Sequence, residues 1–377
     1  MRIAMLGTRG VPAQYGGFET AVQEVGKRLV WAGHDVVVYC RNRGQTHTRY
    51  LGMDLVNLPA VRTRSAETLS HTGLSVMHAL AWSRPDVAIL FNAANAPYLP
   101  LLHAADIPVA IHVDGLEWRR AKWGERGAAY YHWAEARSAR WSDAVIADSR
   151  QIAAHVRRTH GIEATFLAYG APIIHPPSTR LEEVGLESGR YHLMVARFEP
   201  ENHVREIVEG YVASACRWPL VVVGDAPYSD RYRAEVYAAA GGNPRVRFLG
   251  SIWDQGLLDT LYGHALTYLH GHSVGGTNPS LLRAMGAGAP VGAWDVVFNR
   301  EVVGGAGAWF SDACGVAETC LTAEMHPQET LARGLAGQRD VSVRYRWDDV
   351  AAGYEALADD LVSKRLSRSR PPSRSSR

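Results

Sequence analysis

The chain has 377 residues, of which 47% are hydrophobic, and its 40 Lys and Arg residues nearly balance 38 Asp and Glu residues. This length and composition predict a globular protein of two domains, and they exclude a disordered or fibrous chain. The four cysteines show no metal-binding spacing, so we expect reduced thiols in a cytoplasmic protein. The N-terminus MRIAMLG predicts a strand rather than a signal peptide, and no apolar run approaches the roughly 18 residues of a membrane span.

The charge is unevenly distributed along the chain. Residues 1–170 carry 19 Lys and Arg against 14 Asp and Glu, and the final stretch 363–377 carries six basic residues and no acidic ones. Excess positive charge favours contact with an anionic membrane surface or an anionic acceptor. The alternative interpretation is a solvated face followed by a disordered tail.

Short apolar runs alternate with longer amphipathic segments throughout. The predicted strands of the first half are 2–6, 35–40, 86–91, 109–113, 144–148 and 164–168, with helices such as 19–32 and 127–141 between them. The second half repeats the pattern, with strands at 192–196, 220–223, 246–249, 265–270 and 290–294 and helices at 204–215, 231–240 and 279–287. Such alternation is typical of parallel sheets covered by helices on both faces, so we predict an α/β protein with two doubly wound domains.

A segment rich in proline, glycine and polar residues, GAPIIHPPSTRLEEVGLESGR at 170–190, marks the boundary between the domains. We therefore assign residues 1–170 to the first domain and residues 171–346 to the second. A final helix is predicted at 347–362, and a disordered basic tail at 363–377.

The turn after the first strand reads LGTRGVPAQYGGFE, at residues 6–19. It lacks the GxGxxG pattern, which argues against a nicotinamide dinucleotide site. Gly16 and Gly17 directly precede a predicted helix and offer backbone N–H groups to an anion. Arg9 and Glu19 are candidate ligand contacts, with loop support and helix N-terminal charge as equally plausible roles.

The strand at 109–113 ends in the sequence HVDGLEW. Ligands of open α/β sheets bind at the carboxyl ends of strands, so His112 and Asp114 are candidates to hydrogen-bond a sugar. Trp118 lies in an aromatic and basic segment that ends at Trp123. We interpret this segment as facing an acceptor or a membrane, with a packed helix start as the alternative.

In the second half, Arg197 follows a predicted strand, and a guanidinium at such a position suits a diphosphate. A glycine loop comes after the strand 265–270, and a helix starts directly behind it. Asn278 is a favourable N-cap and Pro279 occupies the first helical position. This geometry predicts an anion site at the helix N-terminus, formed by Gly275, Gly276, Thr277, Asn278 and Ser280.

Two stretches, GTRGVPAQYGGFE at 7–19 and HGHSVGGTNPSLLRAMGAGAPVGAWDVVFNREV at 270–302, resemble retaining glycosyltransferases of the group 1 family. The first is similar to the N-terminal signature of a rhamnosyltransferase-like subfamily. The resemblance spans almost the whole chain and implies the GT-B architecture, in which two Rossmann-like domains face each other across a cleft. It places the acceptor on the first domain and the nucleotide sugar on the second, and it implies that the helix at 347–362 returns to the first domain.

The resemblance also assigns roles to residues. It implies that His112 touches the donor sugar and that Arg197 binds the diphosphate, and Asp114 is a candidate to contact the acceptor or to provide orientation. The family carries a lysine about five residues after that arginine, where this chain has Asn202, and two glutamates where it has Gly275 and Arg283. We expect Asn202 to contact the donor phosphates in place of the lysine. We hypothesise that Arg283 supplies the missing cation to the phosphates; the alternative is an ion pair with an acid such as Glu301 or Asp295.

The resemblance implies a hexosyltransferase that moves rhamnose from dTDP-rhamnose to a lipid-linked or polysaccharide acceptor with retention of configuration. No cofactor is expected, and the absence of a DxD motif or a His/carboxylate metal pattern predicts a metal-independent reaction. We expect a cytoplasmic protein at the inner face of the membrane, with no nucleic-acid partner. A catalytically impaired relative that binds a nucleotide sugar or a partner protein, a sugar epimerase and a nicotinamide enzyme remain as alternatives.

Overall fold

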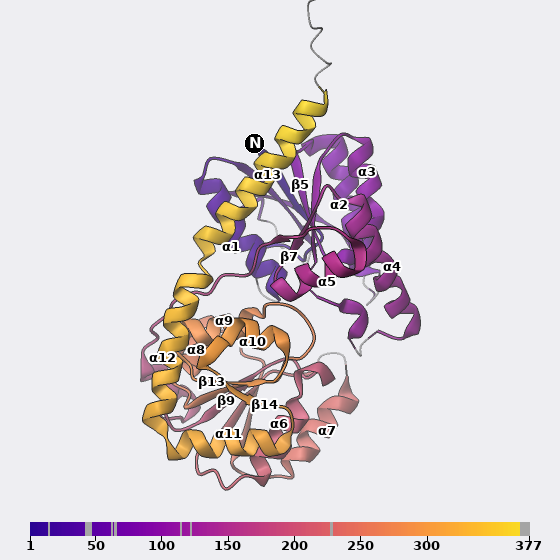
Figure 1. The fold of residues 1–377 in the computed structure, drawn as a ribbon. Helices are drawn as coiled ribbons and strands as arrows, with labels where there is room; N and C mark the ends of the chain where they lie inside the picture. Colours follow the sequence, from indigo (N-terminus) through magenta and orange to yellow (C-terminus); the bar gives the residue numbers. More distant parts are fainter. Residues whose placement is uncertain are drawn as a thin grey trace, which may run out of the picture. The chain divides into compact units, whose positions relative to one another are not determined.

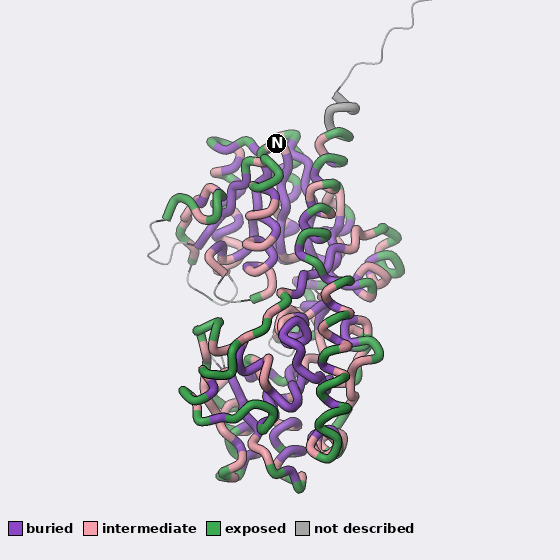
Figure 2. Tube along the Cα trace, turned by 90° about the vertical axis from the view of Figure 1, so that its left-hand side faces the viewer, coloured by how far each residue is buried: buried purple, intermediate pink, exposed green. Residues whose placement is uncertain are grey.

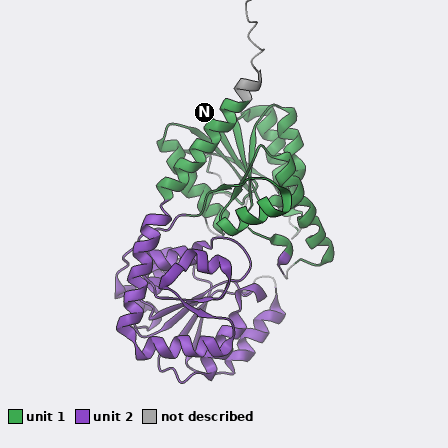
Figure 3. Cartoon of the chain, in the orientation of Figure 1, with its two compact units in different colours: residues 1–118, 123–169, 347–377 green, residues 119–122, 170–346 purple. Residues whose placement is uncertain are grey.

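The computed structural model describes residues 1–13, 16–41, 47–61, 63, 66–113, 115–120, 123–226 and 229–369. They form two compact units, coloured separately in Figure 3. The first unit comprises residues 1–118, 123–169 and those from 347 onward, and the second comprises residues 119–122 and 170–346. Each unit has its own mostly parallel sheet, so the predicted α/β fold with two sheets is confirmed (Figure 1).

The sheet of the first unit has the strand order β3-β4-β2-β1-β5-β6-β7-β8, and all its pairs are parallel except β3 with β4. Its strands are β1 (Arg2–Leu6), β2 (Asp35–Arg41), β3 (Arg49–Tyr50), β4 (Met53–Leu58), β5 (Val87–Phe91), β6 (Val109–Val113), β7 (Ala144–Ala147) and β8 (Thr165–Phe166). Its helices include α1 (Gly17–Trp31), α2 (Glu67–His78), α3 (Leu99–Ala104), α4 (Glu125–Trp141) and α5 (Arg150–His160). Every residue of β5 and β6 is buried, as expected for central parallel strands. Figure 2 colours the buried residues of each unit purple.

The sheet of the second unit has the order β11-β10-β9-β12-β13-β14, and all its strand pairs are parallel. Its strands are β9 (His192–Val195), β10 (Leu220–Val223), β11 (Val246–Gly250), β12 (Thr267–His270), β13 (Val291–Trp294) and β14 (Ala308–Phe310). Its helices include α6 (Val204–Ala213), α7 (Asp230–Ala240), α8 (Gln255–Gly263), α9 (Pro279–Gly286), α10 (Val297–Val303), α11 (Ala313–Met325) and α12 (Pro327–Arg344). The chain runs outward from β9 to β11 and then returns to β12 beside β9. The β9/β12 junction is therefore the topological switch point of this sheet.

The hairpin of β3 and β4 is absent from the prediction. Tyr50 pairs with Met53, and the two residues between them, Leu51 and Gly52, have φ values of 49° and 82°. Two consecutive positive φ values are typical of a type I′ turn, which usually carries Asn-Gly or Asp-Gly. Leucine in the first of these positions gives no turn signal, and this explains why the hairpin was missed.

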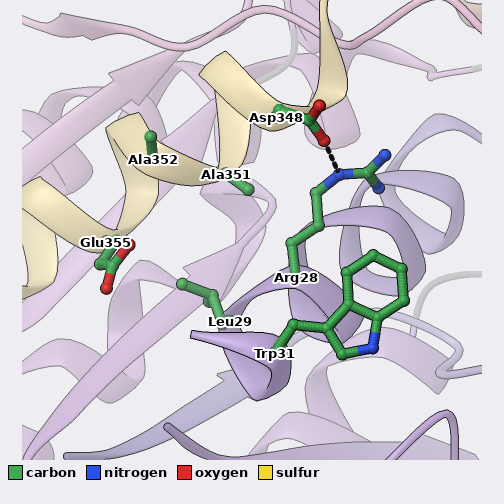
Figure 4. Close-up of a pocket in the computed structure, with 7 residues that line it drawn as sticks. All are labelled: Arg28, Leu29, Trp31, Asp348, Ala351, Ala352 and Glu355. Atoms are coloured by element: carbon green, nitrogen blue, oxygen red, sulfur yellow. Dashed lines mark hydrogen bonds and ion pairs between the residues drawn. The ribbon is translucent and has the colours of Figure 1, made fainter. Parts of the chain in front are cut away.

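The last helix, α13 (Trp347–Ser369), belongs to the first unit and packs against α1. Arg28 Nε donates to Asp348 Oδ1 over 2.7 Å, and His34 Nε2 lies 2.8 Å from Glu355 Oε1. Figure 4 shows the hollow of about 180 Å³ that these two helices line, with Trp31 at its edge. The predicted end of this helix at Val362 was wrong, because the helix continues through the start of the expected tail.

Residues 370–377 of the predicted tail lie outside the described part of the chain. Within the described ranges, none of the helices combines the length and apolar character that crossing a bilayer requires.

Candidate functional site

Polar side chains gather where β9 and β12 end, at the switch point of the second sheet. Arg197 follows β9 by two residues and is exposed, and the short helix Pro200–Asn202 lies next along the chain. Gly271 and His272 directly follow β12. Since ligands of open α/β sheets bind at such a point, this edge is the strongest candidate for a binding site.

Asn202 connects the loops that follow the two strands. Its Nδ2 donates to the carbonyl oxygen of Arg197 over 2.8 Å, and its Oδ1 lies 2.6 Å from Nδ1 of His272. Both ends of the amide are thus used inside the protein, and the side chain is largely buried. We predicted that Asn202 binds phosphate; in the structure it holds the Arg197 loop in place instead.

Further contacts join the same two loops. The backbone N–H of Ser273 donates to the carbonyl of Glu201 over 2.9 Å, and the Ser273 hydroxyl lies 3.0 Å from Nε2 of His203. The ring of His203 stacks on Trp294, with a centroid separation of 3.5 Å and an interplanar angle of 3°. These residues were missed by the sequence analysis, although His272 and Ser273 stand directly behind a predicted strand, where position alone could have suggested them.

The glycine loop after β12 leads into α9 as predicted. Gly275 has a φ of +149°, Thr277 is buried, and Asn278 is the N-cap, with Pro279 at the first helical position. Asn278 Oδ1 accepts from the Ser280 N–H over 2.9 Å and from the Ser280 hydroxyl over 2.7 Å. The helix therefore starts at the edge of the switch point, with its positive end toward the loop.

Two residues of α9 make contacts that differ from those predicted. The Ser280 hydroxyl, predicted to contact the donor, serves the cap of the helix instead. Arg283 was expected to reach the phosphates or to pair with Glu301 or Asp295. In the structure its Nε and Nη2 donate to the two carboxylate oxygens of Asp259 in α8, over 2.6 and 2.8 Å.

Because Arg283 pairs with Asp259 through two hydrogen bonds, we expect its substitution to lower stability rather than ligand affinity. Both partners are mostly buried, so an uncompensated Asp259 carboxylate should destabilise the fold of Arg283→Ala by about 1–3 kcal/mol. Nucleoside-diphosphate affinity should stay within about threefold of the natural protein, corresponding to roughly 0.6 kcal/mol. Urea unfolding and equilibrium binding measure the two effects. If a stable Arg283→Ala protein binds the nucleoside diphosphate tenfold more weakly, Arg283 contacts the phosphates after all.

In the first unit, His112 is the last residue but one of β6, near the strand end as predicted, but it is fully buried. Its Nδ1 lies 2.8 Å from the hydroxyl of Tyr354 in α13, and the rings of Phe18, Phe91 and Tyr169 surround it. The described residues offer no hydrogen-bond partner to its Nε2. The predicted sugar contact is therefore replaced by a core position, and the other candidate of this segment, the residue Asp114, lies outside the described residues.

The turn before α1 is braced by Glu19. Its Oε1 accepts the backbone N–H of Arg9 over 3.0 Å, and burial raises the pKa of this carboxyl. Gly16, with a φ of +103°, precedes α1 without a side-chain cap, and Gly17 is the first helical residue. The structure thus shows both roles considered beside ligand contact, since Glu19 supports the loop and also lies in the first turn of α1.

Trp118, considered as an acceptor contact, is packed inside the first unit. Its indole Nε1 donates to Oε2 of Glu135 over 3.0 Å, and its ring stacks on His132 with a centroid separation of 4.7 Å. Trp118 therefore fits the alternative interpretation, in which this segment packs against the protein rather than facing an acceptor or a membrane.

Burial lowers the pKa values of three buried histidines of the described chain, to about 4 for His71 and about 3 for His112 and His270. The unfolded chain, with a pKa near 6.5, binds protons that the folded chain excludes. The stability that these groups contribute is complete above about pH 6.5 and is lost as the pH falls toward their folded pKa values. Each contributes about 1.4 kcal/mol per pH unit in that window.

We expect the free energy of unfolding of His71→Leu, measured with urea, to fall less steeply than that of the natural protein between pH 6.5 and 4. The difference in slope should correspond to about one bound proton. His175→Leu, at an exposed position, is the matched control. If the unfolding free energy of the natural protein and of both variants depends equally on pH, His71 is not held neutral by burial.

Two protein families match separate parts of the chain, and the gap between the two matches lies within the predicted boundary segment 170–190. Residues 189–323 match the family described as glycosyl transferases group 1. This match falls within the second unit, which is therefore similar to group 1 glycosyltransferases over these residues. Residues 1–172 match a family described as domain of unknown function DUF1972. None of the curated proteins compared with the chain matches it.

Several solved structures share the fold of almost the whole chain. Sucrose-phosphate synthase from Thermosynechococcus elongatus superposes with a TM-score of 0.83 at 19% identity, over 96% of this chain and 99% of that chain. Anabaena HepE in complex with UDP and glucose gives 0.76 at 18% identity, over 96% and 100%. α,α-Trehalose 6-phosphate synthase from Burkholderia multivorans gives 0.74 at 12% identity, over 99% of each. At these identities the likeness establishes the fold, which is the GT-B fold expected from the sequence.

Proposed function

We propose that this protein transfers a sugar from a nucleoside-diphosphate donor to an acceptor. One observation carries the proposal: the group 1 domain places Arg197 and the N-terminus of α9 at the carboxyl ends of β9 and β12, the switch point of its sheet. A guanidinium and a helix N-terminus both favour a diphosphate. The structural relatives include HepE in complexes with UDP and with UDP-glucose.

The chemistry that these groups support is stabilisation of a leaving group. As the bond to the sugar breaks, negative charge develops on the diphosphate, and fixed N–H donors stabilise it without reorganising. The Asn202–His272 contact positions the Arg197 loop for this role. We propose that the leaving phosphate accepts the proton of the acceptor, so that the reaction retains configuration and needs neither a protein base nor a metal ion.

The subfamily resemblance makes dTDP-rhamnose our proposed donor and a lipid-linked or polysaccharide molecule our proposed acceptor. A thermal-shift screen of NAD and of UDP, dTDP, GDP and ADP with their common sugar conjugates tests the donor class. Stabilisation by a nucleoside diphosphate and its sugar supports the proposal, and a response to NAD alone overturns it. Product analysis of the reaction with the best donor then separates transfer from epimerisation.

A catalytically impaired relative that binds a nucleotide sugar is the second candidate. The observation in its favour is Arg283, which stands where the resembling family has a glutamate and is committed to Asp259. Donor stabilisation without hydrolysis or transfer, across a range of acceptors, would support this candidate.

The basic end of the chain supports a proposed peripheral contact with an anionic membrane. Ending the chain after Ser369 preserves α13 and removes three arginines. We expect weaker binding to anionic vesicles at low salt, by at most about 1 kcal/mol for each arginine. Vesicle co-sedimentation measures the effect, with neutral vesicles as the control. Equal binding by both proteins would rule out a membrane role for this segment.

A further inference from the structure

A cluster of metal-ligating side chains lies in the first unit, apart from the residues considered above for the donor. Glu135 comes from the middle of α4, and His155 and His160 come from α5. Their ligand atoms all lie within 4.8 Å of one another. The 20 and 25 positions that separate the histidines from Glu135 form no recognisable sequence motif, so sequence analysis had predicted no such cluster.

We propose that Glu135, His155 and His160 bind a divalent transition-metal ion, with zinc as the best fit. Two imidazole nitrogens and one carboxylate oxygen form a familiar three-ligand zinc set that leaves a fourth position for water. Nε2 of His155 and Nε2 of His160 lie 2.8 and 3.0 Å from the same oxygen, Glu135 Oε1.

The spacing of the ligands suits such an ion. With zinc at about 2.0–2.1 Å from each ligand, tetrahedral geometry separates neighbouring ligand atoms by roughly 3.3 Å. The distances from Glu135 Oε1 to the two histidine nitrogens therefore need to increase by only a few tenths of an ångström. Their exposed fractions are 9% for Glu135, 19% for His155 and 13% for His160, so the cluster is sheltered but remains open to solvent.

The surroundings orient the ligands as outer-shell partners do in metal sites. The indole N–H of Trp118 occupies the other carboxylate oxygen, Oε2, and leaves Oε1 to the histidines. The Thr159 hydroxyl lies 3.5 Å from Nδ1 of His155, on the side of the ring away from Glu135. An ion here would fasten α5 to α4 and, through Glu135, would fix Trp118 in the segment that follows β6.

A second group of possible ligands, in the other unit, is explained without an ion. Glu324 there accepts the backbone N–H groups of Arg217 and Trp218 over 2.8–2.9 Å, and His192 beside it is fully buried. The carboxylate is thus engaged in closing the turn before β10. Cys216 completes this group and provides a spectroscopic control, because thiolate ligands have a distinct signature.

The test uses the full chain after treatment with a chelator. Zn²⁺ is titrated in competition with a chromophoric chelator, and Co²⁺ is used as a spectroscopic probe. We expect one ion per chain and visible Co²⁺ bands without a thiolate charge-transfer band. Glu135→Gln and His155→Gln should each weaken binding by about tenfold or more, while His132→Gln, on the same helix, should not.

Three results would overturn the proposal. These are no competition with the chelator, unchanged affinity in a folded Glu135→Gln or His155→Gln protein, and a charge-transfer band that disappears in Cys216→Ser. Circular dichroism establishes which variants are folded. His160→Gln provides a third ligand substitution should one of the others fail to fold. Because the readout is metal binding, its outcome is independent of whether the protein transfers a sugar.

Discussion

Arg197→Ala should lose most of its transfer activity while keeping its stability. The side chain is exposed at the end of β9, and in the proposed function it meets the diphosphate of the donor. Loss of a charge-assisted contact that strengthens in the transition state costs about 1.5–3 kcal/mol, or roughly 10- to 150-fold in kcat/KM. Steady-state kinetics with the donor found in the thermal-shift screen measures the effect.

The matched control is Arg190→Ala. Arg190 is also exposed, but it precedes β9 and pairs with Glu187, so it lies at the opposite end of the strand. Its removal should leave kcat/KM nearly unchanged. Arg197→Lys should recover part of the lost activity, because it restores the charge without the bidentate geometry. An Arg197→Ala protein with near-normal turnover would contradict the assignment.

Gly271→Ala should damage both the fold and the site. A Cβ atom at this position would lie 2.1 Å from the Asn202 carbonyl oxygen and 2.9 Å from Cδ1 of Ile207. The loops that follow β9 and β12 would have to separate, at a cost of about 1–3 kcal/mol. Their separation would open the Asn202–His272 contact and displace Arg197, so nucleoside-diphosphate affinity should fall as well.

Urea unfolding and equilibrium binding measure these two effects of Gly271→Ala. Gly305→Ala is the control, because a Cβ atom there meets nothing within 4 Å in the described structure and the backbone is not left-handed. Full affinity in Gly271→Ala would show that the close approach of the two loops does not shape the site.

Local sequence signals predicted local structure well. The Asn278 cap followed by Pro279 gave the start of α9, because both act through backbone groups within a few residues. Strands β1 and β6 were predicted at their observed bounds, since buried parallel strands are continuous apolar runs. The short β14 went unrecognised because it carries few residues and little alternation.

Partners distant in sequence could not be predicted in the same way. Arg283 meets Asp259 on another helix, and Asn202 meets His272 some 70 positions later. Such pairs depend on which helices and loops the sheet order brings together. Family spacing suggested that Arg283 and Asn202 face a ligand, whereas tertiary packing gave each a protein partner. The position of Arg197 depends only on where β9 ends, and that was predicted to within one residue.

The place of α13 constrains how this protein could exchange parts with its relatives. The helix follows the whole second unit in the sequence, yet it packs on α1 through Arg28–Asp348 and His34–Glu355. A chimaera that replaces only residues 1–169 would set a foreign α1 against the original α13 and would lose both pairs. A chimaera that keeps both pairs must therefore take residues 1–169 and α13 from the same protein.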